Sequence, residues 1–226
     1  MIKFLRLLLD WSEVWAPLIP LIGLLFKRHQ PYFLRSVIVY LFFAFFINLL
    51  GDIIGDFKSY LPQWLQSNNI LYNVHSIIRF ICFSYFFLAL KQPSFITLKK
   101  VLPFISLLII ITNFSYVENF GNKDHLSGNL LSTEAYLLLI YCVLYYLAKL
   151  RDEVDDLSSG ADFWVATGLS IYVVVNFFVF LFYVPMIDQD PKLADNIWDV
   201  HNVAYIILCI FITKAFYEPA RYRHTV

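Results

Sequence analysis

The chain has 226 residues, of which 60% are hydrophobic and 19% aromatic, while 15% are charged. Its mean hydropathy is +0.66. Its charged fraction is low, because about a quarter of the residues of a typical soluble domain are charged. A soluble core of this size cannot hide so many apolar side chains, so we predict an integral membrane protein in contact with a lipid bilayer. The formal net charge is zero, which gives no reason to expect nucleic acid as a partner.

Seven segments are candidates for crossing the bilayer. The first, at about 12–26 (SEVWAPLIPLIGLLF), is short and contains Pro17 and Pro20, which membrane helices tolerate when neighbouring groups satisfy the freed carbonyls. Six further segments are long enough to span a hydrocarbon core of about 30 Å. These six lie at about 36–55, 70–90, 101–117, 131–149, 163–184 and 198–217.

The distribution of Lys and Arg predicts the orientation. With seven spans and the N-terminus outside, most of the 17 basic residues lie on the inner side and the C-terminus is cytoplasmic, as the positive-inside rule requires. Leaving out the first segment moves Lys3 and Arg6 inside, so charge alone slightly favours six spans. The expected location is the inner (cell) membrane.

A short internal match favours seven spans. SEVWAPLI (12–19) resembles TEAYLLLI (133–140), and LYNVHS (71–76) resembles IWDVHN (197–202). Corresponding helices of a parallel duplication point the same way, although chance matching between apolar segments is the alternative. We predict an all-α, polytopic membrane fold in a single domain with a 3+1+3 plan. Its parts are repeat one at about 12–90, a linker helix at about 101–117 and repeat two at about 131–217.

Each predicted half carries a Glu, an Asn and a His on three successive helices. Polar groups in hydrocarbon are expensive, so they usually face the bundle interior and are functional candidates. The structural alternatives are acids that favour the first turn of a helix and amides that bond neighbouring helices. The six residues are Glu13, Asn48 and His75, followed by Glu134, Asn176 and His201.

Arg79 is the most demanding of the buried polar residues. A charge at its depth costs ~2.5–3.5 kcal/mol even on lenient scales. We therefore expect Arg79 to pair with a carboxylate, Asp52 or Glu134, or with an anionic ligand, because a guanidinium suits bidentate pairing.

The polar stripes of segments 70–90 and 198–217 recur with helical spacing, so each stripe lies on one face. We predict that these faces line one central cleft, open to the non-cytoplasmic side, which binds a small polar ligand or cation. The predicted ligand-binding residues are His75, His201, Arg79, Glu134, Asn48, Asn176, Tyr72, Asn202 and Tyr205.

Three functions fit this pattern. The first is binding or transport of a small polar solute or cation. The second is a sensor or assembly component that acts through a partner membrane protein or a homodimer. The third, an enzyme and the less favoured class, is a metal-dependent hydrolase in which a divalent metal is held by His75, His201, Glu134 and Asp199. Retinal is not expected as a cofactor, because Lys214 in the last segment lies near the inner boundary rather than mid-helix.

The stretches PLIPLIGLLF and IWDVHNVAYIILCIFITKAFY are similar to uncharacterised bacterial seven-helix membrane proteins. This resemblance covers most of the chain and implies no activity. The 3+1+3 plan also resembles that of small sugar transporters and seven-helix receptors, and a shared architecture by itself implies no function.

Overall fold

The computed structural model describes residues 2–90, 92–121, 126–151 and 160–218, and this part of the chain is helical without strands. Six of its helices are long and apolar enough to cross a membrane, and they match the six long predicted segments. Helices of this length and composition indicate an integral membrane protein. The predicted cytoplasmic tail, 219–226, lies outside the described residues. The six helices are α4 (Arg35–Asp56), α5 (Asn69–Ala89), α6 (Ile96–Thr112), α7 (Gly128–Arg151), α8 (Ala161–Gln189) and α9 (Pro191–Tyr217).

The N-terminal region is broken into three short helices, α1 (Ile2–Asp10), α2 (Ser12–Trp15) and α3 (Leu18–Phe26). The apolar stretch Ser12–Phe26 is shorter than the other spans and than the about 20 residues that a bilayer requires. The count of seven spans and the orientation therefore remain predictions. Brief helical turns complete the described chain: η1 (Tyr32–Leu34), η2 (Lys58–Tyr60), η3 (Gln63–Leu65) and the π-helical turn η4 (Asn113–Val117).

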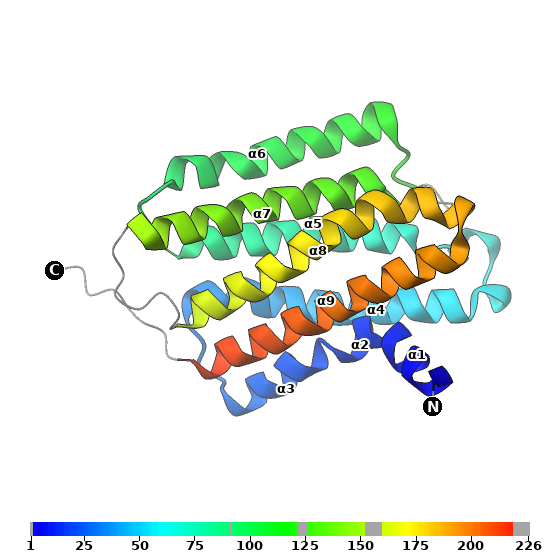
Figure 1. Ribbon diagram of the computed structural model, residues 1–226, viewed down its shortest axis with the longest axis horizontal. Helices are drawn as coiled ribbons and strands as arrows, with labels where there is room; N and C mark the ends of the chain where they lie inside the picture. Colours follow the sequence, from blue (N-terminus) through cyan, green and yellow to red (C-terminus); the bar gives the residue numbers. More distant parts are fainter. Residues whose placement is uncertain (1, 91, 122–125, 152–159, 219–226) are drawn as a thin grey trace.

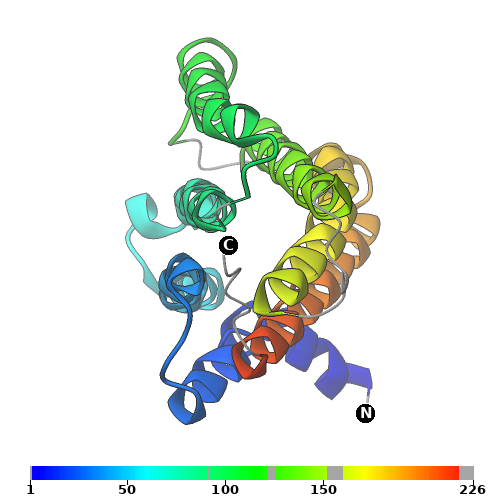
Figure 2. The same ribbon diagram turned by 90° about the vertical axis from the view of Figure 1, so that its left-hand side faces the viewer.

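The long helices run side by side along the longest axis of the molecule (Figure 1). Helix α8 packs along α9 and against α7, while α4 packs against α5. The predicted halves also contact each other, because α5 packs against α7 and α9 packs against α2 and α3. Helix α6 contacts α5 and α7, and it lies outermost in the end view of Figure 2.

The distribution of polarity fits a lipid environment. Phe104, on α6, is 73% exposed, whereas Arg79, on α5, is 3% exposed. Further large apolar side chains point outward from α4 and α8, including Phe42, Phe46 and Phe182. Since hydrocarbon rather than water favours this arrangement, the outer face is suited to lipid and the polar groups are gathered inside.

A close approach of α8 and α9 fixes the position of the last helix. A Cβ atom added to Gly168 of α8 would lie 2.5 Å from the Cβ of Phe211 on α9. Only glycine leaves room for this contact, as small residues do at membrane-helix interfaces. Asp190 caps α9 by accepting a hydrogen bond from the Leu193 N–H at 3.2 Å, and Pro191 follows in the first turn.

Candidate functional site

Arg79 and Glu134 form a two-pronged ion pair between α5 and α7. The Arg79 Nε donates to Glu134 Oε1 and its Nη2 donates to Oε2, each at 2.6 Å. Ser76, nearly one turn earlier on α5, also donates to Oε2 at 2.6 Å. The prediction that Arg79 pairs with a carboxylate is confirmed, and of its two candidate partners, Glu134 is the one bound. Such bidentate, charge-assisted bonds are the strong ones.

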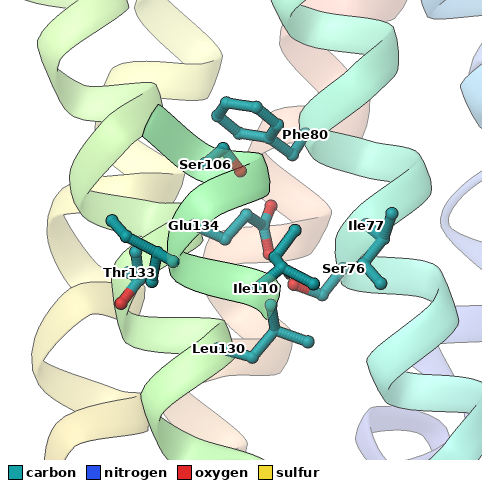
Figure 3. A pocket seen from close by; sticks show the side chains of 9 residues that line it. Ser76, Ile77, Phe80, Ser106, Ile110, Leu130, Thr133 and Glu134 are labelled. Carbon is teal, nitrogen blue, oxygen red and sulfur yellow. Dashed lines mark hydrogen bonds between the residues drawn. The ribbon is translucent and has the colours of Figure 1, made fainter. Parts of the chain in front are cut away.

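A small cavity lies beside this pair, between α5, α6 and α7. Its volume is about 10 Å³, which is close to the least that holds one water molecule. Figure 3 shows Glu134 and Ser76 pointing toward each other at the cavity, with Ser106 of α6 and Thr133 beside them. Glu134 thus lines the cavity together with the Ser76 hydroxyl that donates to it.

Glu13 and His201 form a second buried pair, which joins α2 to α9. The distance from His201 Nε2 to Glu13 Oε1 is 3.0 Å, and both side chains are buried. Tyr72 of α5 donates its hydroxyl to Glu13 Oε2 at 3.2 Å. The other ring nitrogen of His201, Nδ1, bonds to the Asn176 Oδ1. Because the Asn176 amide nitrogen donates to the Tyr172 carbonyl, Oδ1 is an acceptor and Nδ1 carries a proton.

This arrangement leaves one proton to be shared between Glu13 and Nε2 of His201. Either the imidazole is charged beside a carboxylate, or a neutral imidazole accepts from a carboxylic acid. The amide of Asn176 fixes the ring orientation in both cases, as such partners of a histidine do. The shared proton can therefore lie on either partner without a movement of the side chains.

Glu13 lies where the first helix is broken. Pro17 has no N–H, so the Glu13 carbonyl lacks the helical donor four residues along. The Asn48 amide of α4 donates to this carbonyl at 3.0 Å instead. At the preceding break, the Leu9 carbonyl accepts from the Asn202 amide at 3.2 Å. Irregular backbone inside a membrane bundle is tolerated when neighbouring groups satisfy it in this way.

Tyr172 of α8 connects the two pairs. Its hydroxyl accepts from the Arg79 Nη1 at 2.6 Å, and the guanidinium carbon lies 5.1 Å from its ring centre. Its ring lies 5.8 Å from that of His201, edge to face, and its carbonyl accepts from Asn176. The linked groups are Glu134, Ser76, Arg79, Tyr172, Asn176, His201, Glu13 and Tyr72, which we call the polar network.

His75 lies in the interior but bonds to neither carboxylate. Its ring stacks on Tyr40 of α4 with centroids 5.7 Å apart, and among the described residues its Nε2 has no hydrogen-bond partner. Tyr205 stacks on His201 at 6.3 Å. All nine predicted ligand-binding side chains thus lie in the helix bundle. Eight of them are held by hydrogen bonds or ring contacts within the two pairs or to the broken helix, and the ninth, His75, packs on Tyr40.

The open cleft predicted from the sequence is absent around these side chains. His201 is 2% exposed and His75 is 3% exposed, so neither is reached by solvent. The reason is aromatic packing around the two imidazoles. The tyrosines Tyr40, Tyr172 and Tyr205 are almost fully buried and fill the space between the pairs.

The predicted metal ligands are not assembled either. Across the described ranges, no three or more His, Cys, Asp or Glu side chains are placed to hold a metal ion. Glu134 is occupied by Arg79 and Ser76, both ring nitrogens of His201 are bonded, and His75 stacks on a tyrosine. The set of His75, His201, Glu134 and Asp199 therefore does not form a metal centre in this structure.

Sequence reasoning missed Tyr172 and Tyr40. A signal was present for each, because Tyr172 precedes Asn176 by one helical turn and Tyr40 precedes Asn48 by about two. Both tyrosines lie within apolar runs, where a tyrosine is indistinguishable by sequence from an ordinary packing residue.

Comparison with known proteins adds no relative, since no family model matches the chain and no curated protein or solved structure matches it.

Proposed function

We propose that this protein transports a small polar solute or cation, with the polar network as its binding core and the Glu13–His201 pair as the part that exchanges protons. The observation that carries the proposal is a buried, proton-sharing pair located at a break in a helix. Ionisable groups inside a membrane bundle mark solute and proton pathways. Discontinuous helices whose free backbone groups face the interior are typical of binding sites in secondary transporters.

The contacts between the predicted halves support the same proposal. Glu13 is held by α9 and α5, and Glu134 is held by α5. A movement of the N-terminal helices relative to α9 would separate Glu13 from His201. The buried arrangement then corresponds to a closed state, and the outward-facing cleft expected from the sequence corresponds to the state in which these helices move apart.

The test is uptake into liposomes that contain the purified protein and the internal pH dye pyranine. Amino acids, sugars, small carboxylates and alkali-metal salts are added outside one at a time, and the dye reports coupled proton movement. We expect at least one class to give a flux that Glu13→Gln and His201→Gln reduce at least tenfold. The matched control is Glu218→Gln. This change removes the carboxylate that pairs with Lys214 at the end of α9, and neither residue belongs to the polar network.

The proposal fails if both variants move the active solute at the parental rate. It also fails if no solute in the panel produces a flux and none raises the unfolding temperature of the detergent-solubilised protein.

A further inference from the structure

A cluster of buried oxygen atoms lies where α2 packs against α4 and is not used by the polar network. Ser12 is 0% exposed and Asn48 is 3% exposed, and neither the Ser12 Oγ nor the Asn48 Oδ1 has a hydrogen-bond partner among the described residues. The Asp52 Oδ2 is also buried and without such a partner. A buried acceptor without a partner costs about 1–3 kcal/mol, so three of them in one region require an explanation.

The three oxygens belong to residues of α2 and α4, two helices that contact each other. The Asn48 Nδ2 donates to the Glu13 carbonyl at 3.0 Å, so the Asn48 amide lies against the residue that follows Ser12 in α2. Asp52 follows Asn48 by one turn on the same face of α4. The Glu13 carbonyl has a second lone pair that its bond to Asn48 leaves free. The region therefore offers a hydroxyl, an amide oxygen, a carboxylate and a backbone carbonyl.

The charge in this region is unbalanced. Glu13 is compensated by His201 and Tyr72, whereas Asp52 has no ion pair within the described part of the chain. The carboxylates of Glu13, Asp56 and Asp10 all act on Asp52 electrostatically. Burial, together with repulsion from these carboxylates, disfavours a bare negative charge at Asp52, and one positive charge would offset it.

We propose that Ser12, Asn48, Asp52 and the Glu13 carbonyl bind a monovalent alkali-metal cation. Such hard cations take oxygen ligands, and the carbonyls of broken helices supply them in sodium-coupled transporters. One uncompensated carboxylate matches one positive charge, which favours a monovalent over a divalent ion. As a coupling ion, this cation rests on the proposed transport function, but its binding can be measured without any transported solute.

The experiment measures the unfolding temperature of the full chain in detergent at constant ionic strength, with choline chloride replaced stepwise by NaCl or KCl. When the cation concentration is about ten times the dissociation constant of the site, binding linkage predicts that the unfolding temperature rises by about 3 °C or more. The rise is expected with NaCl or KCl and not with choline chloride.

Asp52→Asn is expected to abolish this rise, and Ser12→Ala to shift it to several-fold higher salt concentration. The control is Asp188→Asn, which removes one negative charge from an exposed position near the end of α8, and it should keep the full rise. If Asp52→Asn does not fold, Ser12→Ala together with binding of radioactive sodium to the parent decides the question.

Equal unfolding temperatures in all three salts overturn the inference, and so does a full rise in both Asp52→Asn and Ser12→Ala. Proton-coupled uptake that is indifferent to NaCl and KCl would remove the cation site and leave the transport proposal standing. If the unfolding temperature rises with NaCl or KCl but no solute is taken up, the cation site stands and the transport proposal fails.

Discussion

The two buried pairs have similar depth but different chemistry. Arg79 and Glu134 share two short bonds, with Ser76 adding a third, and an arginine does not lose its proton in proteins. Glu13 and His201 share a single contact of 3.0 Å, and an imidazole, unlike a guanidinium, exists in both a neutral and a charged form in proteins. We therefore expect the first pair to hold α5 to α7 permanently, and we propose that the second changes its state at the broken first helix.

Removing one partner of the fixed pair should have the largest effect on stability. Arg79→Met leaves the Glu134 carboxylate buried without compensation, which typically costs about 3–5 kcal/mol. We expect low yield and a strongly reduced unfolding temperature in detergent, measured by intrinsic tryptophan fluorescence. The double variant Arg79→Met with Glu134→Leu should regain most of the loss. If the single variant unfolds at the parental temperature, the pair does not hold the two helices together.

A substitution in the α8–α9 interface should have an intermediate effect. Gly168→Ala places a methyl group 2.5 Å from the Phe211 Cβ, and overpacking of this kind costs about 1–3 kcal/mol. The change also displaces α9, which carries His201, so the Glu13–His201 contact should weaken. Gly55→Ala is the matched control, because a Cβ there meets only the Asn68 amide at 3.9 Å. An equal response of both variants would contradict the close approach.

Neutral replacements in the exchangeable pair should be milder for the fold. Glu13→Gln and His201→Gln keep hydrogen-bonding groups in place, so each should destabilise by about 1 kcal/mol while uptake is lost. A loss of stability as large as that of Arg79→Met would show that this pair is structural as well. The unfolding temperatures of Glu13→Gln, His201→Gln and Arg79→Met, measured under the same conditions, show which of the two pairs contributes more to stability.

Repair of the helix break should have the smallest effect on stability. Pro17→Ala restores an N–H that can bond to the Glu13 carbonyl, and the expected change is within about 1 kcal/mol. Because the break would be lost, we expect solute flux to fall while the unfolding temperature stays near the parental value. Parental flux in this variant would mean that the break is not a moving part.

The six long membrane helices and the buried position of the polar residues could both be predicted from the sequence, because both follow from the properties of hydrocarbon. A helix that crosses hydrocarbon must be a long apolar segment, and a polar group such as Arg79 costs free energy if it faces lipid. The local sequence pattern therefore predicts both the spans and which side chains face inward. The pairing of Glu13 with His201 could not be predicted, because it joins residues 188 positions apart. Nor could the closure of the cleft, which depends on how Tyr40, Tyr172 and Tyr205 fill the interior.

We propose that the region around Glu13 opens and that the region around Glu134 stays closed. Ala16 and Ala135 are both buried, the first at the helix break and the second beside Glu134. In lipid nanodiscs, with Cys82, Cys142 and Cys209 replaced by alanine, we would measure how fast a charged methanethiosulfonate reagent modifies Ala16→Cys and Ala135→Cys. We expect modification at least tenfold faster at residue 16. Equal rates, or faster modification at residue 135, would contradict it.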